Sequence, residues 1–142
     1  MTITNTASAR YDGLGKTGRG HVSTASGGLD QPYGFNTRFD GQKGTNPEEL
    51  IAAAHASCFT MALAFELAGA GHQDGTLETT ATVSLEKEGD GFSITRSDLA
   101  VTGQVPGIDR AQFEALAQKA KAGCPVSKLL KAEITLKVDF AG

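Results

Sequence analysis

Residues 47–71, PEELIAAAHASCFTMALAFELAGAG, form the longest apolar segment of the chain. Asn46 directly precedes them, where its side chain can accept a hydrogen bond from the first amides of a helix, and Pro47 suits the first helical position. Two glutamates follow and favour the positive end of the helix dipole. Gly69 and Gly71 end the pattern. The segment therefore predicts one long helix that begins at Pro47.

This predicted helix is apolar nearly all round after its first turn. A helix of this kind is stable when neighbouring elements cover most of its surface. Its length is about enough to cross a bilayer, but it contains His55, Ser57, Thr60 and Glu66, which are costly in lipid. We expect a helix buried in the middle of the protein, with no membrane partner.

Patterns typical of strands occur in the sequence both before and after this helix. Glycine-rich turns in the first third of the chain flank two short β-compatible pieces, 7–11 and 21–24. Residues 77–86 alternate with a period of two, which is typical of a half-buried strand. The apolar face resumes after a turn at 88–91 with shifted parity, which predicts a β-bulge near Ser97. A final strand places four residues on one face: Ile134, Leu136, Val138 and Phe140.

A second helix is expected after Asp109, whose side chain can cap it, with Gln112 at the third helical position as in a capping box. Gly123 ends it, and Cys124-Pro125 is typical of a new helix start. The predicted fold class is α+β, with antiparallel sheets and central buried helices. The length of 142 residues suits a single domain, 1–142.

Composition excludes several classes of protein. With 39% hydrophobic and 20% charged residues, the chain can build a folded interior. The net charge of −3 offers no basic excess for nucleic acid. The first residues lack the positive region and apolar run of an export signal, which predicts a cytoplasmic location. Two cysteines are too few for a secreted disulfide scaffold.

The two cysteines, Cys58 and Cys124, occupy different predicted surroundings. Apolar neighbours on the helix would raise the pKa of Cys58, so the simpler interpretation is an inert core cysteine. Cys124 precedes Pro125 at a helix start, which favours a thiolate, although the residue could also merely fill a tight link. Two thiols are the minimum set for chemistry in which one is oxidised to a sulfenic acid and the other condenses with it.

A reactive Cys58 in an apolar site needs a cation, and a guanidinium suits this role because it stays protonated. Arg38 stands out among the five arginines because it lies between Phe35 and Phe39, just before the long helix. Glu48 could hold it there. The alternative is that Arg38 and Glu48 are separate solvated charges.

His55 lies one helical turn from Cys58, but no Asn or Asp partner for a Cys-His pair is evident from the spacing. We expect His55 to have a hydrogen-bonded packing role. Cys58, Cys124, His55 and His72 lack the ligand pairs of a zinc site, so no metal is expected.

Two stretches, TNPEELIAAAHASCFTMAL at 45–63 and GCPVSK at 123–128, closely resemble the family of osmotically inducible protein C and the organic hydroperoxide resistance proteins. Each motif is centred on a cysteine, and the two occur in the order that the family shows. The segment QPYGFNTRF at 31–39 favours the OsmC branch over the Ohr branch. The resemblance covers essentially the whole chain.

This resemblance implies a thiol peroxidase that uses neither haem nor metal. Cys58 matches the peroxidatic cysteine and Cys124 the resolving cysteine. Arg38 matches the guanidinium beside the thiolate, and Glu48 the carboxylate that orients it. Arg19 is the reserve candidate, because the Ohr branch draws its arginine from the earlier glycine-rich segment.

The resemblance also implies partners. Family members look like intertwined homodimers with active sites at the subunit interface, and they use an external dithiol, here expected to be a lipoyl-bearing protein, without a bound cofactor. An apolar lining would favour alkyl or fatty-acid hydroperoxides over hydrogen peroxide. The expected lining residues are Phe35, Phe39, Ile51, Met61 and Phe65.

Two alternatives remain open at this point. A stress protein on the same fold could bind a small ligand without catalysis, because fold does not fix function. The two cysteines could also form a structural disulfide.

Overall fold

Residues 1–141 are described by a computed structural model, in which two compact units divide the chain between Leu50 and Ile51. Unit 1 contains a three-stranded antiparallel sheet in the order β1-β2-β3. The strands are β1 (Ala7–Asp12), β2 (Arg19–Thr24) and β3 (Asp30–Tyr33). The first two confirm the expected strands. β3 was not predicted, because its aspartate and proline disfavour strands. Pro32 is accommodated because β3 lies at an edge of the sheet.

Two short helices complete unit 1, the 3-10 helix η1 (Gly15–Thr17) and α1 (Phe35–Phe39). Thr37 Oγ1 accepts from the Gly34 amide at 2.8 Å and donates to the Gly34 carbonyl at 3.0 Å, which anchors the start of α1. Gly20 of β2 lies beneath the rings of Tyr11 and Tyr33, which meet edge to face with centroids 6.0 Å apart. A Cβ at residue 20 would lie 2.6 Å from a Tyr33 ring carbon, so glycine is required there.

The long helix α2 runs from Pro47 to Gly69, as predicted. The Glu49 amide donates to Asn46 Oδ1 at 2.8 Å, which confirms Asn46 as the cap. Within unit 2, this helix buries one narrow stripe with a spacing of four residues. The stripe consists of His55, Phe59, Leu63 and Leu67.

The opposite face of α2 is uncovered in the single chain, so the expected cover by neighbouring elements is present on one side of the helix only. Only 22% of its most apolar window is buried, although the helix is long and apolar enough to cross a membrane. Met61 is 60% exposed and Phe65 is 72% exposed. Unit 2 has one sheet to place against α2, and a sheet covers one side of a helix. An apolar face of this kind is typical of an interaction surface.

Unit 2 contains a second three-stranded sheet in the order β4-β5-β6, formed by β4 (Thr76–Glu88), β5 (Gly91–Gln104) and β6 (Glu133–Phe140). The β4-β5 hairpin is antiparallel, with a register shift that leaves Thr95 unmatched between Ile94 and Arg96. The expected bulge is therefore present, two residues before Ser97.

The third strand corrects the prediction of purely antiparallel sheets, because β6 pairs with β5 in parallel. Helices α3 (Arg110–Gly123) and α4 (Pro125–Leu129) form the crossover that carries the chain back to the same end of the sheet. Both helices begin where the sequence predicts. The Gln112 amide donates to Asp109 Oδ1 at 2.8 Å, and Pro125 opens α4.

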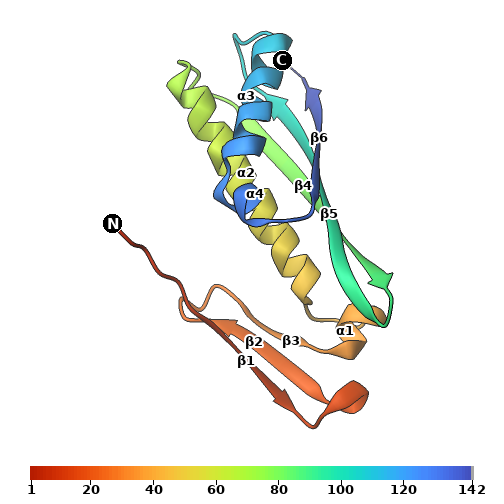
Figure 1. The fold of residues 1–142 in the computed structure, drawn as a ribbon. Helices are drawn as coiled ribbons and strands as arrows, with labels where there is room; N and C mark the ends of the chain where they lie inside the picture. Colours follow the sequence, from red (N-terminus) through yellow and green to blue (C-terminus); the bar gives the residue numbers. More distant parts are fainter. Residues whose placement is uncertain (142) are drawn as a thin grey trace. The chain divides into compact units, whose positions relative to one another are not determined.

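Within unit 2, α2 and α3 lie on the same side of the sheet (Figure 1). Their buried stripes and the inner face of the sheet form the hydrophobic core. Phe113 of α3 packs directly on the backbone of Gly103 in β5, where a Cβ would lie 2.1 Å from the ring. Lys119 and Glu66 join α3 to α2 with an ion pair at 3.2 Å.

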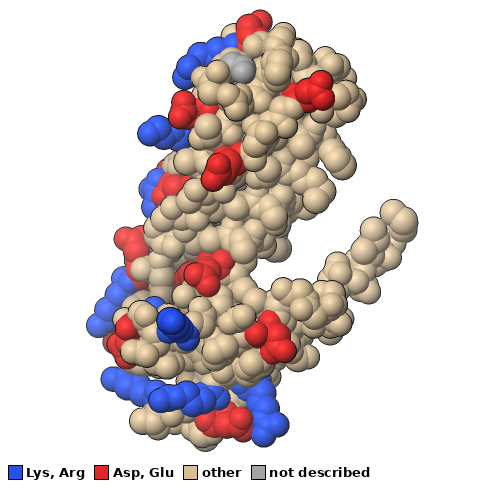
Figure 2. All heavy atoms as spheres, turned by 180° about the vertical axis from the view of Figure 1, so that it is seen from behind, with Lys and Arg blue, Asp and Glu red and all other residues tan. Residues whose placement is uncertain are grey.

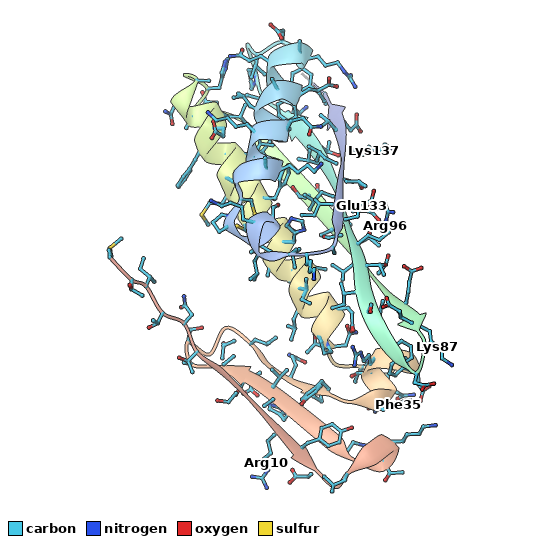
Figure 3. All side chains as sticks on the ribbon, in the orientation of Figure 1. Arg10, Phe35, Lys87, Arg96, Glu133 and Lys137 are labelled. Atoms are coloured by element: carbon cyan, nitrogen blue, oxygen red, sulfur yellow. The ribbon has the colours of Figure 1, made fainter. Side chains whose placement is uncertain are left out.

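The other side of this sheet is polar. Figure 3 shows Arg96, Glu133 and Lys137 on the side away from α2 and α3. Arg96 contacts Glu133 at 3.2 Å and Asp98 at 2.9 Å. Positive and negative side chains are interspersed on the face that Figure 2 shows, which agrees with the small net charge.

Candidate functional site

The middle of α2 and the junction between α3 and α4 bring the two cysteines together in unit 2. Cys58 lies in the middle of α2, and Cys124 lies between α3 and α4, where its amide donates to the Ala120 carbonyl at 2.9 Å. Pro125 then begins α4, which turns the chain directly after the cysteine. Both cysteines are free thiols, and their side chains are hydrogen-bonded to each other.

The two sulfur atoms differ in access. Cys124 is 0% exposed, whereas Cys58 is half-buried. Cys58 borders a pocket of about 470 Å³ whose lining is largely apolar. The pocket is lined by Ser57, Cys58, Met61, Ala62, Phe65 and Pro125. Cys58 is therefore not a sealed core residue, and a small apolar molecule can meet its sulfur while Cys124 stays behind it.

The hydrogen bonds of the pair move the two pKa values in opposite directions. Burial raises the pKa of Cys58, and the bond to Cys124 raises it further, against a smaller opposing effect of the Val126 backbone. Burial also acts to raise the pKa of Cys124, but hydrogen bonds with Cys58 and Ser127 outweigh it and lower that pKa. Within unit 2, these hydrogen bonds therefore favour negative charge on Cys124 over Cys58.

Unit 1 holds the predicted cation and its carboxylate as a pair. Arg38 Nε donates to the two carboxylate oxygens of Glu48 at 3.0 and 3.2 Å, and Nη2 also donates to Oε1. Glu48 is 8% exposed, and the side chain of Arg38 is 34% exposed. The alternative of separate solvated charges is therefore wrong. The placement of Arg38 beside Cys58 stays a prediction.

Arg38 borders a cavity of about 350 Å³ in unit 1, together with Phe35 and the two tyrosines of the sheet. Lys16 also lines this cavity, with Nζ 5.1 Å from the centroid of the Phe35 ring. Lys16 was not predicted as a site residue, because nothing in its spacing along the chain links it to α1. The reserve residue Arg19 donates from Nη1 to the backbone carbonyls of Thr17 and Gly18, at 3.1 and 3.2 Å.

His55 is fully buried and hydrogen-bonded through both ring nitrogens. Nδ1 lies 2.6 Å from Ser97 Oγ, and Nε2 lies 2.8 Å from Ser127 Oγ. Burial lowers the pKa of His55, so the imidazole is neutral. The expected hydrogen-bonded packing role is confirmed.

Neither serine partner of His55 was predicted from the sequence. Ser97 lies on β5 and Ser127 on α4, and only the second occurs in a recognisable motif, GCPVSK. As for metals, no group of three His, Cys, Asp or Glu side chains in residues 1–141 is placed to hold an ion.

The site therefore consists of two free thiols on an α+β fold, Cys58 half-buried beside an apolar pocket and Cys124 fully buried. The chain belongs to the OsmC family, whose model for the OsmC-like protein matches residues 40–139.

Relatives extend this assignment over nearly the full chain. The chain is 58% identical to "Peroxiredoxin OsmC" of Escherichia coli (strain K12) over 137 residues, 96% of each chain. It is 29% identical to "Organic hydroperoxide resistance protein OhrB" of Bacillus subtilis (strain 168) over 123 residues, 85% of this chain and 88% of OhrB.

Solved structures share the fold. The crystal structure of Bacillus subtilis OhrB matches with a TM-score of 0.70 and 30% identity, covering 97% of this chain and 98% of OhrB. An organic hydroperoxide resistance protein OsmC from Legionella pneumophila matches with a TM-score of 0.72 and 26% identity, covering 100% and 99% of the two chains.

Proposed function

We propose that the protein is a thiol-dependent peroxidase that reduces organic hydroperoxides to alcohols during oxidative or osmotic stress. The names of the relatives support a peroxidase-type stress protein. One observation about the residues of this protein supports the proposal. The accessible sulfur of Cys58 lies in an apolar pocket and is already in contact with the sulfur that would resolve it, Cys124.

The first step oxidises Cys58. Arg38, held by Glu48, lies beside the Cys58 thiolate in this proposal and offsets the cost of burying its charge. The sulfur attacks the terminal oxygen of the hydroperoxide, so that an S–O bond forms and the O–O bond breaks. The alkoxide leaves and takes up a proton to become the alcohol, and Cys58 is left as a sulfenic acid.

The second step resolves the sulfenic acid. The Cys124 thiolate attacks Cys58 Sγ, so that the S–S bond forms and the S–O bond breaks. Hydroxide leaves and is protonated to water. An external dithiol, which we propose to be a lipoyl group on a partner protein, then reduces the Cys58-Cys124 disulfide by thiol-disulfide exchange and is itself oxidised. No metal or bound cofactor takes part in these steps.

The lining of the Cys58 pocket supports an alkyl or fatty-acid hydroperoxide as substrate. Met61 and Phe65, two of the five apolar residues expected to line the site, border this pocket with Cys58. Apolar walls favour an alkyl chain and give hydrogen peroxide little to bind. Phe35 lies instead in the Arg38 cavity of unit 1.

We further propose that the protein acts as a cytoplasmic homodimer. The exposed apolar face of α2, with Met61 and Phe65, supports this proposal because a folded chain rarely leaves such a surface in water. Burial of this face against a second copy would also close the Cys58 pocket from solvent.

A titration of the reduced protein with an alkyl hydroperoxide, followed by counting of free thiols, tests the proposal. We expect loss of both thiols at an equimolar dose, and no loss with the Cys58→Ser variant. Persistence of both thiols would support the alternative, a non-catalytic binder of small ligands. Steady-state assays then compare the alkyl hydroperoxide with hydrogen peroxide, and equal kcat/KM values would remove the claim of substrate preference.

A further inference from the structure

A continuous chain of buried side chains runs behind the two thiols. It begins at Ser97 on β5, passes through His55 on α2 to Ser127 on α4, and ends at Cys124. Ser97 is 1% exposed, and both His55 and Cys124 are 0% exposed. Three elements of the fold thus converge on the sulfur that the proposed mechanism uses second.

The number of available hydrogens limits which side chain donates and which accepts in this series of hydrogen bonds. Each serine hydroxyl donates one hydrogen, and a neutral imidazole carries one N–H. If the hydrogen is on Nε2 of His55, the imidazole donates to Ser127, whose own hydrogen is then available for Cys124. If it is on Nδ1, Ser127 must donate to His55 and has no hydrogen left for the sulfur.

We propose that His55 is a positioning residue that carries its hydrogen on Nε2 and, through Ser127, directs an O–H donor at Cys124 Sγ. In this arrangement Ser97 donates to Nδ1, and Ser127 stabilises the Cys124 thiolate that attacks oxidised Cys58. The assignment of that attack rests on the proposed function, whereas the direction of the hydrogen bonds rests on the buried chain alone.

Two further observations support this direction. Burial lowers the pKa of His55, so the neutral imidazole carries one ring hydrogen. The position of that hydrogen decides which serine accepts from the ring and which donates to it. Ser127 lies in the first turn of α4, three residues after Cys124, and its side chain contributes to the lowered pKa of Cys124. His55 does not touch the hydroperoxide in this scheme and acts only through Ser127.

Nitrogen NMR of the imidazole in the reduced protein tests the direction without any substitution. The chemical shifts of the two ring nitrogens distinguish the tautomers, and we expect the Nε2–H form. The Nδ1–H form would overturn the proposal.

A thiolate titration by ultraviolet absorbance tests the consequence for Cys124. In the Cys58→Ser background, where Cys124 is the remaining thiol, we expect Ser127→Ala to raise its pKa by about one unit. His55→Leu should raise it in the same direction, and His55→Gln, whose amide can donate to Ser127, should restore much of the shift. An unchanged pKa with His55→Leu would overturn the proposal.

Thr60→Val is the matched control for these variants. It removes a hydroxyl from α2 that donates to the Ala56 carbonyl and to Thr79, and that takes no part in the hydrogen bonds of His55. We expect no shift in the Cys124 pKa there. Neither the NMR nor the titration uses a hydroperoxide, so a protein without peroxidase activity can still pass or fail both. In a protein that retains Cys58, Ser127→Ala should slow disulfide closure about tenfold and leave the oxidation of Cys58 unchanged.

Discussion

Arg38 donates from Nε to both carboxylate oxygens of Glu48, at 3.0 and 3.2 Å. The carboxylate is almost fully buried, and the guanidinium is one-third exposed. Ion pairs of this geometry hold a planar guanidinium in one orientation, which a lysine cannot reproduce. The pair therefore keeps a permanent positive charge fixed at the first turn of α2.

Replacement of Arg38 should slow the reaction of Cys58 with an alkyl hydroperoxide. We expect a loss of roughly 10–100-fold in the second-order rate constant for Arg38→Ala, because a hydrogen bond to a charged group is worth about 1.5–3 kcal/mol. Arg38→Lys should recover little of this rate. Stopped-flow measurement of Cys58 oxidation provides the rates.

Arg19→Ala is the control for this prediction, because Arg19 bonds to backbone carbonyls in its own unit. It should leave the rate unchanged. A large loss with Arg19→Ala and none with Arg38→Ala would assign the cation to the glycine-rich segment instead.

The two cysteines should respond differently to substitution. Cys58→Ser should abolish turnover, since the pocket then holds no nucleophilic sulfur. Cys124→Ser should allow one turnover and leave Cys58 oxidised, because no second thiol can close the disulfide. Mass spectrometry with a reagent that traps sulfenic acids checks both outcomes. Continued turnover by Cys124→Ser with the dithiol would show that resolution does not require Cys124.

The exposed face of α2 should mediate self-association. We expect Phe65→Glu to convert a dimer to a monomer, because it places a charge within an apolar interface. Sedimentation equilibrium measures the change. Phe92→Glu, at an exposed aromatic of the β4-β5 hairpin, is the comparison and should remain dimeric. A monomeric wild-type protein at all concentrations would contradict the homodimer.

The buried His55 should make folding sensitive to mild acid. Its pKa is lowered in the folded protein, so below the ordinary value of 6.5 the unfolded chain takes up a proton that the folded chain does not. The free energy of unfolding should therefore decrease as the pH is lowered below 6.5, by at most about 1.4 kcal/mol per pH unit. Urea denaturation at several pH values measures this slope, and the slope should decrease in His55→Gln. An equal slope in both proteins would assign the acid sensitivity to other groups.

The contact between Gly103 and Phe113 gives a test of the core. A Cβ at residue 103 would lie 2.1 Å from the ring, so Gly103→Ala should lower the free energy of unfolding by about 1–3 kcal/mol. Gly123→Ala, at the end of α3, meets no atom within 4 Å and should be neutral or slightly stabilising. Denaturant titrations of both variants check the difference. Equal stability of the two would contradict the packing of Phe113 on β5.

Local signals predicted much of this fold. Asn46 and Asp109 cap the helices that the sequence placed after them, because N-caps depend on a few adjacent residues. The pairing of β6 could not be predicted in this way, since alternation shows that a strand has a buried face and not which neighbour it joins. The uncovered face of α2 was also missed, because an all-round apolar pattern does not say whether the cover comes from the same chain.

In the candidate site, too, some contacts were predicted from the sequence and others were not. The resemblance implied that Cys58 and Cys124 act together, although the sequence does not give their separation; in the structure a hydrogen bond joins the two thiols, and their redox roles stay a prediction. The proximity of Arg38 and Glu48 also followed from the motifs, and the structure confirms it within unit 1. Ser97 lies 42 residues from His55 along the chain, on a strand whose serine has no distinctive spacing, so only the folded sheet reveals this partner.

Peptide mapping of the wild-type protein after an equimolar dose of alkyl hydroperoxide tests the central claim most directly. We predict that the peptides containing Cys58 and Cys124 are recovered joined by a disulfide, with one molecule of alcohol formed for each disulfide. Recovery of both peptides with free thiols, while the hydroperoxide remains intact, would contradict the proposed peroxidase.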